Sequence, residues 1–186
     1  MRKLKLQMQI TVDGFVAGPE GQQDWMTFSR DEKIIKVRND LANSMDTILM
    51  GRKMTDGFVS YWESIVKNPE HPEFSFAKIM VDTPKIVFSK SQKTIEGLNV
   101  TITNEDVVEV VNALKNKKGK DIIVYGGAGF VSSLIENNLI DEYYLITNPT
   151  AIGDGLKIFK QRTRLQLVKT TTFKCGKVVN KFVPLK

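Results

Sequence analysis

The chain has 186 residues and a formal net charge of +6 at pH 7, and its hydrophobic content of 41% is that of a globular protein with a sizeable core. Its only cysteine, Cys175, excludes an intrachain disulfide, and its only histidine, His71, leaves too few nitrogen and sulfur ligands for a metal site. No apolar run approaches the ~20 residues of a membrane-spanning helix and no signal-peptide pattern opens the chain, so we expect a cytoplasmic protein with no membrane partner.

The first predicted element is a strand over residues 4–10, where leucine, methionine and isoleucine alternate with polar side chains and give one apolar face. Residues 11–24 are rich in glycine and read as a long loop of the kind that often serves function. A helix is predicted over residues 31–45, with Ser29 as its N-cap and Glu32 in the capping-box position.

Further along, the pattern predicts a strand over 46–50, a short helix that ends near 61, a helix over 71–82, and strands over 85–88 and 98–102. Asn104 is predicted to cap a helix that ends near Leu114. A buried strand at 122–124 precedes two glycines and a helical pattern, and a strand over 142–147 is followed by a hairpin of 165–173 and 177–183. This alternation indicates an α/β fold in one domain, residues 1–186, with a mixed, mostly parallel sheet flanked by helices and an antiparallel C-terminal hairpin.

The glycine pair Gly126-Gly127 lies between a predicted strand and a predicted helix. In such a turn, bare backbone N–H groups and the positive end of the helix dipole point at one place, and the lack of a side chain lets an anion approach. Two other predicted strands end in a similar way, one at Gly51-Arg52-Lys53 and one at Ser89-Lys90. Ligands of open α/β sheets bind at the carboxyl ends of the strands, so these turns together favour a dinucleotide phosphate as ligand.

The positive net charge fits an anionic ligand or a solvated basic surface. The basic residues form no stripe with interleaved aromatic side chains, so we expect no nucleic-acid partner.

Six blocks of the sequence resemble the dihydrofolate reductase superfamily, in the branch related to the reductase domain of the riboflavin-biosynthesis deaminase–reductase. In chain order they are residues 10–18, Asp24-Trp25, 49–53, 87–90, 124–127 and 139–145. The resemblance implies a dihydrofolate-reductase-like sheet, NADPH as cofactor and a homodimer.

The same resemblance implies roles for individual residues at the cofactor. Gly51 and Arg52, followed by Lys53, would lie at the adenosine phosphate end, with Ser89 and Lys90 beside the 2′-phosphate. Gly126 and Gly127 would hold the pyrophosphate, often through a cis peptide bond, within a block that includes Tyr125, Ala128 and Phe130. Val16 and Ala17 would border the nicotinamide, with backbone groups that meet its carboxamide.

Two positions depart from the family pattern. Met54 stands where the family has a threonine that meets phosphate, and Thr55 follows one residue later. Tyr125 stands where the riboflavin reductase domain typically has a glutamate, and a tyrosine is not an anionic base near neutral pH.

A reductase also needs a proton donor near the ring that it reduces. The candidate acids are Asp13, Asp24, Asp31 and Glu32, of which Asp24 beside Trp25 fits the family pattern best, and Asp31 lies close to where dihydrofolate reductases keep their substrate-binding carboxylate. The aromatic residues Trp25, Phe28, Phe58 and Trp62 are candidates for stacking on a flat substrate, with core packing as the alternative.

The sequence thus predicts an NADPH-dependent reductase of a small planar heterocycle, pyrimidine- or pteridine-like, that resembles 5-amino-6-(5-phosphoribosylamino)uracil reductase and dihydrofolate reductase. The alternative is a non-catalytic nucleotide-binding protein that has kept the NADPH cradle.

Overall fold

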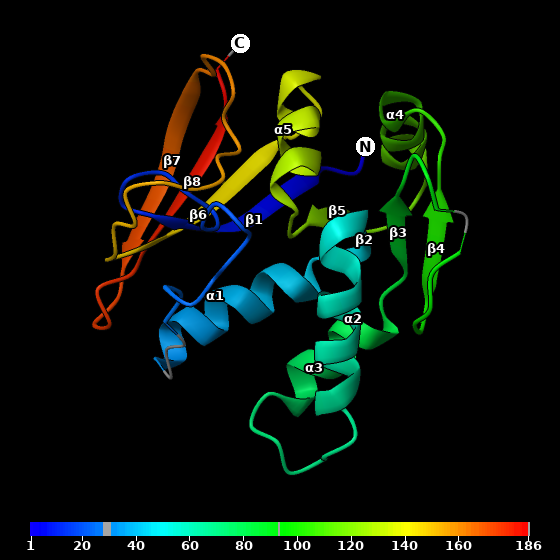
Figure 1. Ribbon diagram of the computed structural model, residues 1–186, viewed down its shortest axis with the longest axis horizontal. Helices are drawn as coiled ribbons and strands as arrows, with labels where there is room; N and C mark the ends of the chain where they lie inside the picture. Colours follow the sequence, from blue (N-terminus) through cyan, green and yellow to red (C-terminus); the bar gives the residue numbers. More distant parts are fainter. Residues whose placement is uncertain (28–30, 93, 186) are drawn as a thin grey trace.

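In the computed structural model, which describes residues 1–27, 31–92 and 94–185, the chain forms one sheet with helices on both faces (Figure 1). The strands are β1 (Leu4–Thr11), β2 (Met45–Gly51), β3 (Lys85–Phe88), β4 (Val100–Thr103), β5 (Asp121–Val124), β6 (Glu142–Asn148), β7 (Leu165–Thr172) and β8 (Val178–Pro184). The helices are α1 (Glu32–Asn43), α2 (Arg52–Ile65), α3 (Phe74–Asp82), α4 (Val107–Asn116) and α5 (Ala128–Glu136).

The sheet has eight strands in the order β4-β3-β2-β5-β1-β6-β8-β7. The six strands from β4 to β6 are parallel, and β8 and β7 add an antiparallel hairpin at one end. This arrangement confirms the predicted mixed, mostly parallel sheet with an antiparallel C-terminal hairpin. The fold is dihydrofolate-reductase-like, as the sequence resemblance implied.

Two apolar layers cover the two faces of the sheet. One face packs Leu4 and Leu6 of β1 and Val124 of β5 against α4 and α5, and the other packs Ile123 of β5 and Met50 of β2 against α1, α2 and α3. Figure 1 shows α4 and α5 on one side of the strands and the other three helices on the opposite side. Among the described residues, none of the helices combines the length and apolar character needed to cross a membrane.

The prediction that β1 buries a single face is wrong in one respect. Lys5 is 8% exposed, because β1 lies at the centre of the sheet between β5 and β6, with helices on both sides. Its ammonium is compensated by the carboxylate of Asp121 at 2.7 Å and the hydroxyl of Ser44 at 2.9 Å. Buried charge of this kind is tolerated only when it is paired.

The helix caps also differ from the prediction. Asp31, not Ser29, is the N-cap of α1 and accepts a hydrogen bond from the Lys33 amide, while Ser29 lies outside the described residues. Asp106, not Asn104, caps α4 and accepts from the amides of Val108 and Glu109. The helix predicted from residue 71 begins at Phe74. Two residues able to cap stand near the start of each of these two helices, Ser29 and Asp31 before α1 and Asn104 and Asp106 before α4, and only the backbone path selects the cap.

Candidate functional site

The three predicted phosphate-binding turns converge on one edge of the sheet. β3, β2 and β5 are parallel neighbours, so Ser89, Gly51 and Gly126 follow their carboxyl ends side by side. The loop after β1, with Val16 and Ala17, continues the same line because β1 is the next strand. We call this line the glycine edge. It spans three inter-strand spacings of about 4.8 Å each, enough for one extended ligand to meet all four turns.

Two helices begin at the glycine edge, and both begin without a cap. α2 starts after Gly51 and α5 after Gly127, with no side-chain hydrogen bond to the first-turn amides and no acidic residue in the first turn. By contrast, Asp31 caps α1 and Asp106 caps α4, and each of those helices has a glutamate in its first turn. First-turn amides need an acceptor, so the bare starts of α2 and α5 fit an external anion.

The absence of side chains at the glycine edge lets these two helix starts meet. The Gly51 amide donates to the Gly126 carbonyl at 3.3 Å, and a Cβ on Gly51 would lie 2.6 Å from the Cβ of Phe130 in the first turn of α5. The Gly126-Gly127 peptide bond is cis, as the resemblance implied, and Gly126 has a φ of +153°. A Cβ on Gly127 would make an ordinary van der Waals contact with the Cβ of Met54 at 3.8 Å, so this position has room for a methyl group.

Arg52 is held toward the turn that follows β3. Its Nε donates to Gln92, while its Nη1 lies 2.7 Å from the Asp56 carboxylate one helical turn along α2. Ser89 is buried, and its hydroxyl accepts from the Gln92 amide at 3.0 Å, so it shapes the turn that carries the exposed Lys90. Arg52 therefore follows the end of β2 and Lys90 the end of the neighbouring β3, and two cationic residues at this end of the edge suit a phosphate.

The structure shows what Met54, which stands where the family has a threonine, contacts. Its Sδ would lie 2.6 Å from a Cβ on Gly126, so its thioether packs against the glycine pair. Thr55 does not take over the role of the missing threonine, because it is fully buried and its hydroxyl donates to the Gly51 carbonyl at 3.1 Å. The hydroxyl that the family places near phosphate is therefore replaced here by an apolar contact.

Val16 and Ala17 are both buried, and part of their backbone is already paired. The Val16 amide donates to the Leu156 carbonyl and the Leu156 amide donates to the Ala17 carbonyl, each at 2.8 Å. These two groups are thus not available to a nicotinamide carboxamide. Asp13 fastens the same loop, since its carboxylate accepts from the amides of Ile152 and Gly153. Asp13, one of the candidate acids, therefore has a structural role in this loop.

The Tyr125 side chain packs against α2, where its ring stacks on Phe58 with centroids 5.7 Å apart. The chain of aromatic contacts continues from Phe58 to Trp62 and on to Phe76, whose ring lies under the guanidinium of Arg38. Phe58 and Trp62, two candidates for substrate stacking, are therefore engaged with other aromatic rings. Burial raises the pKa of Tyr125, so this phenol stays protonated.

Asp24 and Asp31, the two candidate acids that the family pattern favours, have different environments. Asp24 is exposed, whereas the neighbouring Trp25 is 8% exposed, so the indole does not bury the carboxyl. Asp31 is occupied as the N-cap of α1. Phe28, the fourth aromatic candidate, lies outside the described residues.

Sequence reasoning missed Gln92, which orients Arg52, and the polar side chains of Gln7 and Asn148 inside the protein. No sequence pattern around Gln92 indicates that its side chain would contact Arg52. Gln7 could have been noticed, because a glutamine within a strand at the centre of a sheet is unusual. That β1 is central, however, follows only from the tertiary structure.

Bare helix starts, two cationic residues and glycine turns at the carboxyl ends of parallel strands form an arrangement that can bind an extended anion. The protein belongs to the RibD C-terminal domain family, whose model matches residues 2–179. Over 182 residues it is 36% identical to the uncharacterized protein YyaP of Bacillus subtilis, with 95% of this chain and 92% of YyaP covered. It is also 27% identical to the uncharacterized protein YwjB of the same organism over 175 residues, with 92% of each chain covered.

Solved structures agree on the fold. A putative riboflavin biosynthesis protein from Shewanella sp. PV-4 matches over the full length of both chains with a TM-score of 0.73 and 17% identity. The deaminase/5-amino-6-(5-phosphoribosylamino)uracil reductase of Thermotoga maritima matches 99% of this chain with a TM-score of 0.68 and 17% identity. This chain spans 57% of the length of the Thermotoga protein.

Proposed function

We propose that this protein is an NADPH-dependent reductase of a small planar heterocycle, pyrimidine- or pteridine-like. One observation carries the proposal: two uncapped helix starts meet at the ends of neighbouring strands, with Arg52 and Lys90 beside them. Membership in the RibD C-terminal domain family and the reductase named among the similar structures support the same activity.

In this proposal the amides at the start of α5, from Gly127 to Phe130, hold the pyrophosphate, and Arg52 and Lys90 meet the 2′-phosphate. Lys53, exposed in the first turn of α2, adds positive charge at the same end. NADPH, when bound, supplies a hydride. The protein positions the two rings and supplies the proton.

Asp24 is the proposed proton donor. Its exposure allows rapid proton exchange with water, and it precedes Trp25 at the end of the loop after β1. Asp24→Asn should lower turnover by about 100-fold, within the usual range for loss of a general acid, and change NADPH affinity little. Glu20→Gln, an exposed change in the same loop, is the control. An unchanged turnover rate in Asp24→Asn would show that another group donates the proton.

The cofactor assignment is tested by titration of the full chain with NADPH and with NADH, followed by nicotinamide fluorescence. Arg52→Ala should lower the affinity for NADPH by about 10- to 100-fold, the range for a lost hydrogen bond to a charged group. The affinity for NADH should fall much less. Arg164→Ala removes an exposed arginine just before β7 and should leave the affinities for both nucleotides unchanged. Equal weakening of both nucleotides in Arg52→Ala would contradict the placement.

A second candidate function is a nucleotide-binding protein without turnover, and the contact of Met54 with the glycine pair favours it. NADPH oxidation against a panel of pyrimidines and pteridines separates the two, because only the reductase consumes the cofactor. Met54→Thr should tighten NADPH binding in either case, since it restores the family's hydroxyl.

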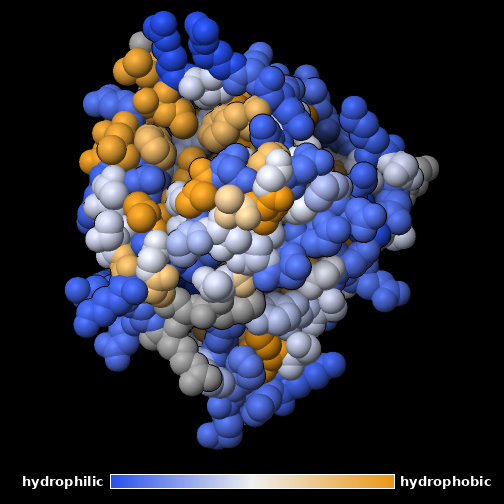
Figure 2. Space-filling view, turned by 60° about the vertical axis from the view of Figure 1, so that its left-hand side comes forward, coloured by the Kyte–Doolittle hydropathy of each residue, from blue (hydrophilic) through white to orange (hydrophobic). Residues whose placement is uncertain are grey.

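We also propose that two copies of the chain associate through β7. This edge strand is eight residues long and nearly all exposed, and its Leu167 and Val168 are each 53% exposed. Figure 2 shows hydrophobic side chains gathered on the upper left of the face that includes the hairpin. An exposed strand edge with apolar side chains is a template for pairing with a second copy.

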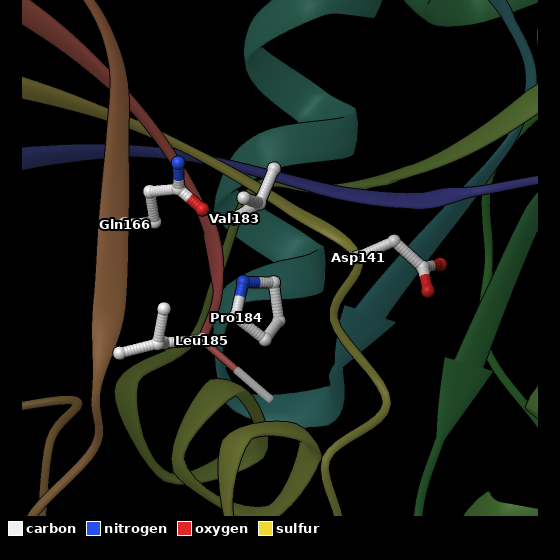
Figure 3. A pocket seen from close by; sticks show the side chains of 5 residues that line it. All are labelled: Asp141, Gln166, Val183, Pro184 and Leu185. Atoms are coloured by element: carbon white, nitrogen blue, oxygen red, sulfur yellow. The ribbon is translucent and has the colours of Figure 1, made fainter.

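A shallow depression of about 530 Å³ adjoins that strand, between Gln166 of β7, Val183 and Pro184 of β8, and Leu185. Figure 3 shows these residues on the hairpin, with the Asp141 carboxylate directed away from them. Asp141 is engaged elsewhere, with Lys115 at 2.6 Å. The depression therefore belongs to the apolar hairpin surface and not to the glycine edge.

A further inference from the structure

Charge is distributed unevenly along the chain. Residues 155–186 carry nine of the 27 lysine and arginine residues and none of the 21 aspartate and glutamate residues. Their formal charge is +9, whereas residues 1–154, with 18 basic and 21 acidic residues, have a formal charge of −3. We call residues 155–186 the acid-free segment. The net charge of +6 therefore comes from one part of the chain and not from an evenly basic surface.

The acid-free segment lies at one side of the molecule. It forms β7, β8 and the loop before them, drawn in orange and red in Figure 1. β7 is the last strand of the sheet, and nearly all of its side chains are exposed. The acids at the start of the neighbouring β6 are already paired, Asp141 with Lys115 and Glu142 with Lys3 and Lys181. The positive charge is thus gathered in space as well as in sequence.

Most of these cations face solvent. Among the described residues of the segment, six cationic side chains are exposed: Lys157, Lys160, Arg162, Arg164, Lys169 and Lys174. Two others have partners inside the protein, since Lys177 donates to the Thr27 carbonyl and Lys181 lies 3.1 Å from the Glu142 carboxylate. The segment has no carboxylate of its own to neutralise the exposed cations, so they attract an external anion.

Exposed aliphatic side chains lie among the same cations. Four are found in the segment: Leu156 (37% exposed), Leu167 (53%), Val168 (53%) and Leu185 (51%). Leu156 directly precedes Lys157, Val168 directly precedes Lys169, and the Leu185 amide donates to the Arg164 carbonyl at 3.0 Å. Figure 2 shows the apolar side chains at the upper left with hydrophilic ones around them. Cationic and aliphatic groups therefore share one surface.

The strand register leaves the charge of one lysine uncompensated. The pairing of β7 with β8 shifts just before Lys169, so that Val168 is an extra residue and Lys169 lies opposite Lys181. Like charges directly opposite each other on neighbouring strands are destabilising. Glu142 offsets the charge of Lys181 but not that of Lys169. An anion over this part of the hairpin would relieve the repulsion.

The kinds of exposed side chain indicate which polyanion fits. Single-stranded nucleic acids stack their bases on exposed aromatic rings, but the aromatic residues of the segment, Phe159, Phe173 and Phe182, are buried or half-buried. Protein interfaces are depleted in lysine, whereas four of the six exposed cations are lysines. An anionic membrane surface binds cations through its headgroups and aliphatic side chains at the boundary with the acyl chains. The combination of the two on one hairpin favours the membrane surface.

We propose that the acid-free segment is a peripheral membrane-binding surface, whose exposed cations contact anionic phospholipid headgroups while Leu167, Val168 and Leu185 enter the headgroup boundary. Such binding uses side chains and needs no spanning helix. Pairing of two copies through β7 uses backbone groups and leaves the side chains on the faces of the strand, so both can occur together. The segment contains none of the residues at the glycine edge, and the proposal is independent of the reductase function.

The test is co-sedimentation of the full chain with vesicles of phosphatidylcholine, either alone or mixed with phosphatidylserine. We expect binding to the mixed vesicles, which added salt weakens, and no binding to phosphatidylcholine alone. Absence of binding to the mixed vesicles, or equal binding to both kinds, would overturn the proposal.

A pair of cation variants locates the contact. Arg164→Gln combined with Lys169→Gln should weaken vesicle binding by about 30-fold, because each cation near an anionic membrane contributes about fivefold. The matched control, Lys67→Gln combined with Lys117→Gln, lowers the net charge equally at exposed positions outside the segment and should weaken binding by less than about threefold. Equal losses in the two double variants would show attraction by net charge alone and overturn the proposal.

A pair of aliphatic variants separates a membrane from other polyanions. Val168→Thr, which keeps the β-branched shape, combined with Leu185→Ser should weaken vesicle binding by about tenfold. The melting temperature of each variant shows whether it is folded. Unchanged vesicle binding in the folded aliphatic variant would overturn the proposal. Binding of labelled oligouridylate or poly-L-glutamate, without binding of the mixed vesicles, would assign the surface to nucleic acid or to an acidic protein instead.

Discussion

The glycine edge and the β7 edge both present unpaired backbone groups, but they present them differently. At the glycine edge the bare amides belong to the starts of α2 and α5 and converge, because Gly51 allows close contact with Phe130. Along β7 the unpaired groups form a straight row beside exposed side chains. Converging donors suit a compact anion, whereas a straight row suits another strand.

The helices also differ in how their N-termini are capped. α1 and α4 begin with a capping aspartate, and both helices that start at the glycine edge lack one. An acid there would satisfy the amides internally and repel a phosphate. α3, which starts elsewhere, also lacks a side-chain cap, so what distinguishes the glycine edge is that two uncapped starts lie side by side there.

The largest effect should come from filling the glycine edge. Gly127→Ala adds a methyl group that the protein itself accommodates, with its nearest neighbour at 3.8 Å, but that occupies the space of the phosphate. We expect NADPH affinity to fall by about 100-fold, roughly 2.8 kcal/mol, with the melting temperature retained. Gly57→Ala, in the middle of α2 with open space around it, is the control. Normal NADPH binding in Gly127→Ala would make this turn an ordinary one and remove the contrast with β7.

The next effect concerns the attachment of the hairpin to the rest of the sheet. Burial opposes ionisation of Glu142, but hydrogen bonds from Lys3, Tyr144 and Lys181 outweigh it and lower its pKa from 4.5 to about 2. A carboxyl whose pKa is lower in the folded state stabilises the fold above pH 4.5, and this stability is lost as the pH falls toward 2.

Glu142→Gln should cost about 1–3 kcal/mol at pH 7, the range for a hydrogen bond to a charged group. It should also flatten the decline in stability between pH 4.5 and pH 2. Urea unfolding at several pH values measures both. If the unfolding free energy of Glu142→Gln still falls between pH 4.5 and pH 2 as in the unmodified protein, other carboxylates cause the acid destabilisation. Glu136→Gln, at the exposed end of α5, is the control.

A smaller effect should separate capped helices from uncapped ones. Asp106→Ala removes the cap of α4 and should cost about 1 kcal/mol of stability, because two amides lose their acceptor. NADPH affinity should stay the same, since α4 does not begin at the glycine edge. Asp106→Asn, which preserves the cap, should restore stability. A change in NADPH affinity in either variant would contradict the prediction that only the uncapped helix starts at the glycine edge bind the cofactor.

The smallest effect on the folded chain should come from the β7 edge. Leu167→Lys alters a side chain that is 53% exposed and should change the unfolding free energy by less than about 0.5 kcal/mol. If two copies pair through β7, the same change should shift the protein from dimer to monomer in sedimentation velocity. Val12→Lys, at a 61% exposed position in the loop after β1, tests whether any added charge does the same. A monomeric unmodified protein would leave β7 as an unpaired edge.

Individual positions show how far prediction from the sequence reaches. The strand at 85–88 is predicted to the residue, because β-branched and aromatic residues form a short run between a proline and a polar turn. The cap at Asp31 is missed because Ser29 offers the same local chemistry, and the buried Lys5 is missed because its partners, Ser44 and Asp121, are remote in sequence. Tyr125 is marked by the sequence as a departure, but its contact with Phe58 and its place beside Gln7 depend on strand register.

The sequence by itself determined the kinds of element, the polar and glycine turns at the ends of three strands, and the family. Turn chemistry and hydrophobic period act over a few neighbouring residues, so a local pattern is enough to show them. Only the tertiary structure decided that β3, β2, β5 and β1 are consecutive in the sheet, which brings Ser89, Gly51, Gly126 and Val16 to one edge. Strand order is set by the burial of side chains from remote parts of the chain, and no local pattern encodes it.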